Sequence, residues 1–277
     1  MTRLLHLSDL HFGAHDSRLV DAVERRADEL KPDLVVISGD FTQRARTEQF
    51  REACEFLGRL RDHGHEVLGV PGNHDVPLYD VLRRFMSPLA RYRRFIDGTL
   101  CPFVELPGVA VLGINTARSL TFKEGRINRQ QVDFIRETFS RTPPEAMRVL
   151  VTHHPLFALK VGNDAGRAIG RQELALDAIE EAGVDMLLAS HNHHASSQEA
   201  SDLVTRAGGA LVIQAGTATS TRVREQEQSF NVIDIVRRTV AITVEAWKGG
   251  EFVAWDVQRY DWTEGRWRIL RSAEPAH

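Results

Sequence analysis

Over the first 190 residues, short apolar runs alternate with segments whose apolar residues recur at helical spacing. The run "DLVVIS" at 33–38 is almost continuously apolar, which is typical of a strand buried on both faces. The segment before it places Leu19, Val23 and Leu30 on one face of a predicted helix. Strands that alternate with helices in this way predict parallel strands joined by helical connections. The expected fold class is therefore α/β.

The pattern changes in the last quarter of the chain. Residues 208–262 contain the successive apolar runs "ALVIQAG", "SFNVIDIV", "TVAITVEAW" and "FVAWDVQRY", with short connections between them. This strand-rich C-terminal part predicts a second, more antiparallel sheet. Because the sequence contains no internal repeat, low-complexity stretch or Pro/Gly-rich linker, we expect residues 1–277 to form a single domain.

The charge balance restricts the partners of the protein. A formal net charge of −3 argues against a broad surface for a nucleic-acid polymer, which requires clustered Lys and Arg. The N-terminal run "MTRLLHLSDLHFG" is too short and too polar for a signal peptide. No apolar run approaches the roughly 20 residues of a transmembrane helix. We therefore expect a cytoplasmic protein without a transmembrane segment.

Acidic, amide and histidine side chains collect in five turns, each directly after a predicted strand. These turns contain Asp9 and His11 (SDLHFG), Asp40 (SGDFTQ), Asn73, His74 and Asp75 (PGNHDV), His153 and His154 (VTHHPLF), and His191 and His193 (SHNHH). A single turn of this kind is usually only a turn. The carboxyl ends of parallel strands meet at one edge of a sheet, however, so five such turns predict one shared site. Their side chains are of the types that bind metals.

The order D-x-H, G-D, G-N-H-D, H-x-P and H-x-H over residues 9–193 resembles the calcineurin-like metallophosphoesterase superfamily. The resemblance implies a four-layered αββα sandwich of two mixed β-sheets flanked by helices. The stretch "GVPGNHDVPLYD" is most similar to the class III bacterial cyclic-nucleotide phosphodiesterases and the related glycerophosphodiesterases. The chain departs from the family at Ser190, where the last motif usually begins with Gly.

The resemblance also implies a binuclear metal centre of Mn, Fe or Zn. By this resemblance the ligands are Asp9, His11 and His193 for one ion and Asn73, His153 and His191 for the other, with Asp40 bridging both. The residue types agree with this implication, because two nearby cations require an anionic bridge. A mixture of His, Asp and Asn suits these metals better than Ca²⁺, which prefers sites made only of oxygen ligands.

The histidines and the acid beside these ligands are expected to have other roles. The resemblance implies that His74 contacts the phosphate and protonates the leaving alkoxide. The alternative is a histidine that only orients its neighbours. Asp75 is expected to orient His74, and His154 to lie beside the ligands. In an extended segment His191 and His193 point to the same side, whereas His194 points to the other.

Residues 78–100 follow the G-N-H-D turn and are predicted to form a cap over the site. Within them, the stretch 80–96 interleaves five arginines with seven large apolar residues. Such a stretch suits either the steering of an anionic substrate or contact with an anionic lipid surface. The alternative is a solvated helix whose arginines extend their apolar stems along its surface.

Together these observations predict a binuclear metal-dependent phosphodiesterase. It would hydrolyse small phosphodiesters, of the 3′,5′-cyclic nucleotide or glycerophosphodiester class, by in-line attack of a metal-bound hydroxide. The alternatives are a lipid-linked phosphoester or pyrophosphate hydrolase at the membrane surface and a non-catalytic scaffold of the same fold. The sequence leaves open whether the chain forms a homo-oligomer.

Overall fold

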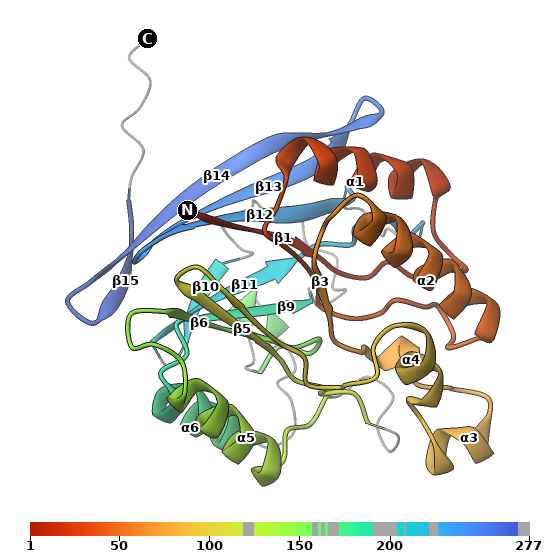
Figure 1. Ribbon diagram of the computed structural model, residues 1–277, viewed down its shortest axis with the longest axis horizontal. Coiled ribbons are helices and arrows are strands. Elements are labelled where there is room, and N and C mark those ends of the chain that lie inside the picture. The colour runs from red at the N-terminus through yellow and green to blue at the C-terminus, as the bar shows by residue number, and fades with distance from the viewer. Residues whose placement is uncertain are drawn as a thin grey trace.

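The fold was described from a computed structural model of the full chain. It describes residues 1–118, 125–156, 160–161, 164–165, 172–190, 204–207, 209–221 and 227–270, with only the backbone at 160–161, 164–165, 172 and 204–207. Two β-sheets pack face to face, and helices cover the outer face of each sheet (Figure 1). This arrangement is the four-layered αββα sandwich that the resemblance implied.

The first sheet has seven strands. Their order is β15 (Arg266–Ile269), β14 (Glu251–Thr263), β13 (Thr239–Lys248), β12 (Ser229–Val236), β1 (Thr2–Leu7), β2 (Leu34–Ile37) and β3 (Val67–Gly69). The strands β1, β2 and β3 run parallel to one another, whereas the neighbours from β12 to β15 pair antiparallel. The parallel part of this sheet therefore carries the first three polar turns at the carboxyl ends of its strands.

The second sheet has six strands. Their order is β10 (Val204–Ala207), β11 (Ala210–Ala215), β9 (Met186–Ser190), β6 (Met147–Val151), β5 (Val109–Gly113) and β4 (Phe103–Leu106). The central strands are parallel, and the two edge strands β4 and β10 are antiparallel. A further small pair joins β7 (Lys160–Val161) to β8 (Asp164–Ala165). Both large sheets are therefore mixed, as the resemblance implied.

Two of the helices begin at side-chain caps that the sequence provides. The helices are α1 (Ser17–Leu30), α2 (Thr47–Asp62), the short η1 (Asn73–Asp75), α3 (Val81–Met86), α4 (Ala90–Phe95), α5 (Arg129–Ser140) and α6 (Gln172–Ala182). The Asp16 side chain accepts a hydrogen bond from the backbone of Arg18 at the start of α1. Asn128 and Gln131 form the reciprocal capping box predicted at the start of α5.

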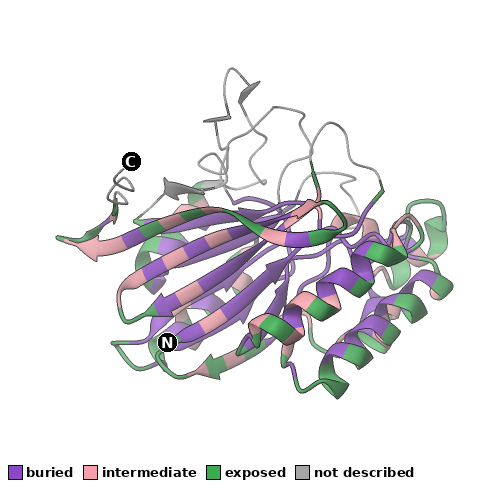
Figure 2. Ribbon diagram, turned by 90° about the horizontal axis from the view of Figure 1, so that it is seen from above, coloured by how far each residue is buried: buried purple, intermediate pink, exposed green. Residues whose placement is uncertain are grey.

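The strand alternation divides the core into three apolar layers. In β1, Leu5 packs toward α1 and α2, whereas Leu4 packs between the two sheets. A third cluster lies between the second sheet and the helices α5 and α6. Because successive side chains point to opposite faces, the strands β2, β5 and β9, in which every residue is buried, are covered on both faces. Buried residues are purple in Figure 2.

The expectation of a separate antiparallel C-terminal sheet is wrong. The strand β12 pairs antiparallel with β1, and Ile233 lies opposite Leu4, so the tail extends the first sheet. The strand β11 joins the second sheet beside β9. The physical reason is that β2 covers only one edge of β1. The backbone groups of its other edge are buried and require partners. The division into domains stays a prediction.

None of the helices in the described part of the chain is both long enough and apolar enough to cross a membrane.

Candidate metal centre

The polar turns of both sheets meet at the carboxyl ends of their strands. Asp9 and His11 follow β1, Asp40 follows β2, Asn73 lies in η1 after β3, and His153 follows β6. His11 Nε2 lies 3.3 Å from Asp9 Oδ1 and 3.7 Å from Asp40 Oδ2. His153 Nε2 lies 3.5 Å from Asp40 Oδ1 and 3.0 Å from Asn73 Oδ1. The described members of the predicted ligand set thus form one cluster.

The remaining predicted ligands are His191 and His193, which lie outside the described residues. The same is true of His194. Their assignment stays a prediction.

The backbone at the first two turns adopts a conformation that L-residues rarely occupy. Asp9, His11 and Asp40 have φ angles of 54°, 50° and 55°. Hydrogen bonds between the turns stabilise this conformation, since Asp9 N donates to the Gly39 carbonyl (3.1 Å) and His11 N donates to the Asp40 carbonyl (3.0 Å). Non-glycine residues in this region cost free energy and concentrate at functional sites. In these two turns, the residues with positive φ are Asp9, His11 and Asp40, and their side chains converge on the cluster.

Two hydroxyls fix one side of the Asp9 carboxylate. Ser8 Oγ donates to Asp9 Oδ2 at 2.7 Å, and Ser190 Oγ donates to the same oxygen from the end of β9. The other oxygen, Oδ1, lies beside His11. The departure from the family at Ser190 therefore adds a hydrogen-bond donor to a predicted metal ligand.

Asp40 lies at the centre of the cluster and is fully buried. Its Oδ1 accepts a hydrogen bond from the His74 backbone at 2.9 Å, and its Oδ2 has no hydrogen-bond partner among the described residues. Burial by itself would raise the pKa of this carboxyl, but the nearby histidines 153, 74 and 11 hold the pKa below its ordinary value. A Cβ at Gly72 would lie 2.1 Å from Asp40 Oδ1, so the turn before η1 requires glycine.

The hydrogen bonds of His153 test whether the cluster suits a metal ion. His153 Nδ1 donates to the Ser38 carbonyl at 2.8 Å, so in the neutral ring Nε2 carries a lone pair. This lone pair faces two further acceptor oxygens, Asn73 Oδ1 and Asp40 Oδ1. In that neutral form no hydrogen lies between Nε2 and these two oxygens, so the three acceptors repel one another and a bound cation would offset the repulsion. The residues present therefore fit a divalent metal ion.

His74 is held at the edge of the same cluster. Its Nδ1 donates to the Gln43 carbonyl at 2.8 Å, which leaves Nε2 for a metal or a substrate. Its ring packs edge-on against His11, with ring centroids 4.8 Å apart. His11, Asp40 and His74 each offer one ligand atom, and these atoms all lie within 4.8 Å of one another.

Asp75 has a different role from the one expected. We expected it to orient the His74 ring, but its carboxylate accepts hydrogen bonds from the backbone of Phe41, Thr42 and Gly72 and from the Thr42 hydroxyl. The Gln43 carbonyl holds the His74 ring instead. Burial and the Asp40 carboxylate raise the pKa of Asp75 to about 6. Asp75 therefore ties the turn after β2 to the turn after β3.

His154 lies against His153, with ring centroids 4.8 Å apart. Its Nδ1 makes a hydrogen bond of 2.8 Å with Thr116 Oγ1. Burial, together with His153, lowers its pKa to about 3, so the ring is neutral. The position beside the ligands agrees with its expected place in the site.

Several residues that shape the cluster were not singled out in the sequence. Ser8 precedes Asp9 directly and offered a signal, because serine hydroxyls commonly bond neighbouring groups. Gln43 and Ser38 act through backbone carbonyls, which any residue type supplies. No sequence pattern indicates such contacts.

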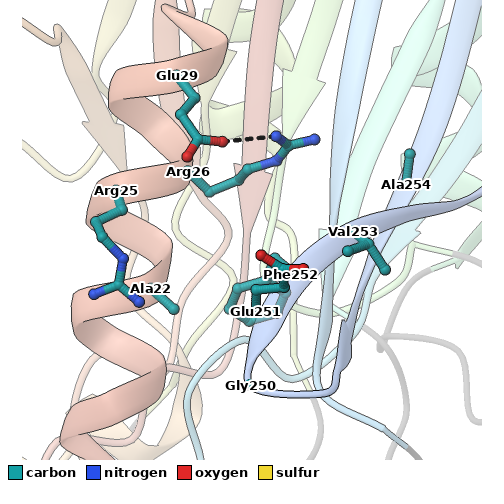
Figure 3. Close-up of a pocket in the computed structure, with 9 residues that line it drawn as sticks. All are labelled: Ala22, Arg25, Arg26, Glu29, Gly250, Glu251, Phe252, Val253 and Ala254. Carbon is teal, nitrogen blue, oxygen red and sulfur yellow. Dashed lines mark hydrogen bonds and ion pairs between the residues drawn. The ribbon is translucent and has the colours of Figure 1, made fainter.

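A separate surface cavity of about 320 Å³ lies between α1 and the hairpin of β13 and β14 (Figure 3). Its most enclosed cation, Arg26, already pairs with Glu245 at 3.0 Å and with Glu29 at 2.8 Å. None of the converging ligands lines this cavity.

The fold is α/β, with two mixed sheets flanked by helices. A cluster of His, Asp and Asn side chains lies at the strand ends, and its residue types fit metal ions. The family model for calcineurin-like phosphoesterases matches residues 2–195, and the chain belongs to that family. Family membership implies two metal ions in this centre.

Similar proteins include two curated phosphodiesterases. The chain is 26% identical over 274 residues to the cAMP/cGMP dual specificity phosphodiesterase MT0825 of Mycobacterium tuberculosis, covering 90% of this chain and 81% of that protein. It is 36% identical over 83 residues to the glycerophosphodiester phosphodiesterase GpdQ of Enterobacter lignolyticus, covering 26% of this chain and 29% of that protein. Among solved structures, a dimetal phosphatase from Danio rerio shares the fold, with a TM-score of 0.64, 12% identity and coverage of 91% and 98% of the two chains.

Proposed function

We propose that this metallophosphoesterase is a phosphodiesterase that acts on small phosphodiesters of the cyclic-nucleotide or glycerophosphodiester class. The observation that carries the proposal is the convergence of Asp9, His11, Asp40, Asn73 and His153, with His74 at the edge of the cluster. The similarity to a cyclic-nucleotide phosphodiesterase over most of the chain supports the diester class.

The same five side chains are the described residues that would hold the metals. Bound there, divalent cations such as Mn, Fe or Zn would supply positive charge that draws in the phosphate, activates water and offsets the charge that develops at phosphorus. Asp40 would contribute the central negative charge, since its two oxygens face His153 and His11 separately.

His74 is positioned to handle a proton. Hydrolysis of a diester forms one P–O bond from water and breaks one P–O bond to the leaving alkoxide, which must gain a proton. The Gln43 carbonyl fixes the hydrogen of Nδ1, so proton donation from His74 must come from Nε2 of the protonated ring.

A hydrolysis screen tests the substrate class. The purified protein with added Mn²⁺ would be assayed on bis(p-nitrophenyl) phosphate, p-nitrophenyl phosphate, cyclic AMP and glycerophosphocholine, with Asp40→Asn as the inactive control. The proposal expects faster turnover of the activated diester than of the monoester, and turnover of at least one natural diester. Preference for the monoester, with no natural diester hydrolysed, would refute the diesterase assignment and leave the family assignment intact.

A further inference from the structure

An exposed apolar surface lies directly after the G-N-H-D turn. It consists of Leu78, Tyr79, Val81, Leu82, Phe85 and Met86, here called the α3 patch. Leu82 and Tyr79 are each 72% exposed, and Met86 is 76% exposed. In Figure 1, α3 lies at the periphery of the molecule beside α4, outside the layered sandwich. Contiguous apolar surface of this kind on a folded protein marks an interaction site.

The orientation of α3 is the reverse of an ordinary surface helix. Such a helix buries its apolar face and exposes its charges. In α3, Arg84 is buried, with Nη1 donating to the Pro77 carbonyl at 3.0 Å, whereas Val81, Leu82 and Phe85 face solvent. The structure thus holds the apolar side chains of α3 outward and its arginine inward.

A cationic side chain lies against the α3 patch, and others are exposed on the next helix. The Arg44 guanidinium lies over the Tyr79 ring, 5.6 Å from its centroid. Arg93 and Arg94 are exposed on the adjacent α4. Arg83 pairs with Asp80 at 2.9 Å, so those two charges offset each other. Arg44 is therefore a cation in direct contact with the patch.

We propose that the α3 patch docks on an anionic phospholipid surface. Apolar side chains at an interface enter the boundary between head groups and acyl chains, and arginines beside them attract lipid phosphates. Both elements are present here, because Arg44 lies over Tyr79 of the patch. A soluble anion would use the arginines and leave the apolar side chains unexplained, whereas a lipid surface uses both.

Docking would bring the metal centre close to the lipid. Tyr79 stands four residues after Asp75, and Arg44 follows Gln43, whose carbonyl holds the His74 ring. The edge of the centre that carries His74 thus lies next to the α3 patch. The docking itself does not depend on hydrolysis, so it can be tested by binding alone.

Co-sedimentation of the full chain with vesicles tests this proposal. We expect binding to vesicles of phosphatidylcholine mixed with phosphatidylglycerol, weaker binding at high salt, and little binding to phosphatidylcholine alone. The double substitution Leu82→Glu with Phe85→Glu should weaken binding at least about tenfold, because two anchoring side chains are lost. Arg44→Gln should weaken it about fivefold, the effect of one arginine near an anionic surface.

Trp255→Glu provides a matched control. Trp255 is 64% exposed on β14, in the sheet rather than in α3, so its substitution should leave vesicle binding unchanged. Thermal unfolding checks that each variant folds. Absence of wild-type binding to the mixed vesicles would overturn the proposal, as would unchanged binding of the Leu82→Glu, Phe85→Glu variant. If light scattering shows a wild-type dimer that this variant converts to monomer, a second copy covers the patch and the lipid assignment is wrong.

Discussion

At the scale of single residues, the metal centre depends on which oxygen and nitrogen atoms the side chains direct toward one another. Asp40 directs one oxygen toward His11 and the other toward His153, and His153 turns Nε2 toward the cluster because its Nδ1 bonds the Ser38 carbonyl. The convergence of these side chains could be predicted from the sequence because each follows a strand and strand ends converge. The contacts that orient them could not, because Ser38 and Gln43 act through their backbone carbonyls.

Ser190 should tune the affinity for metal through Asp9. Replacing Ser190 with Ala removes a hydroxyl that donates to Asp9 Oδ2, so the carboxylate is held less firmly. Loss of a group that orients a ligand typically weakens metal binding about 10–100-fold. Titration calorimetry of Mn²⁺ into the metal-free protein measures this change.

The matched substitutions for Ser190 are Ser8→Ala, which removes the other donor, and Ser190→Thr, which retains a hydroxyl. We expect Ser8→Ala to weaken binding similarly and Ser190→Thr to retain it. Equal Mn²⁺ affinity in the wild type and in Ser190→Ala would mean that this hydroxyl does not position the ligand.

His74 should contribute to the rate without holding the metals. His74→Ala is expected to lower turnover of a diester with a poor leaving group about 10²–10⁴-fold, the usual range for a general acid. The loss should be smaller for a nitrophenolate leaving group, which needs no proton. Steady-state rates on the two substrates, together with metal content, measure this. An equal loss on both substrates would indicate charge stabilisation, and loss of metal would indicate that His74 is a ligand.

At the scale of elements, the sequence predicted where the strands lie better than which strands pair with each other. The apolar runs identified β1, β2, β6 and β9, because burial on both faces leaves a clear pattern. The pairing of β12 with β1 was missed, because any strand edge offers the same backbone donors and acceptors. Likewise, the composition of 80–96 did not reveal that α3 buries an arginine and exposes its apolar side chains.

The strand β1 carries a buried histidine that should make stability depend on pH. His6 is fully buried beside Ser38 Oγ, and burial lowers its pKa to about 3 from the ordinary 6.5. Between these values the unfolded chain binds a proton that the folded chain does not. The free energy of unfolding should therefore fall as pH drops below 6.5, by about 1.4 kcal/mol per pH unit from this group, and should keep its full value above that pH.

Denaturant unfolding of wild type and His6→Leu at several pH values between 4 and 7 checks this dependence. The variant should show a smaller slope, by about one proton, whatever its absolute stability. Parallel pH profiles for the two proteins would show that His6 does not carry the effect.

At the scale of the whole molecule, the two sheets act together. The first sheet supplies Asp9, His11, Asp40 and Asn73, and the second supplies His153, so the cluster forms only when the sheets pack face to face. The resemblance to the metallophosphoesterase family implied that both sheets contribute to one site, because motifs that are far apart in the sequence must come together in space to form it. The substrate class could not be predicted as firmly, since it depends on side chains around the centre rather than on the shared ligands.

Elemental analysis of the purified protein tests the central claim, that these strand ends form a two-metal centre bridged by Asp40. The wild type should hold two metal ions per chain. Asp40→Asn should hold at most one, because an amide of the same shape lacks the negative charge that offsets two neighbouring cations. Two tightly held ions in Asp40→Asn, or none in the wild type after incubation with Mn²⁺, would contradict the assignment.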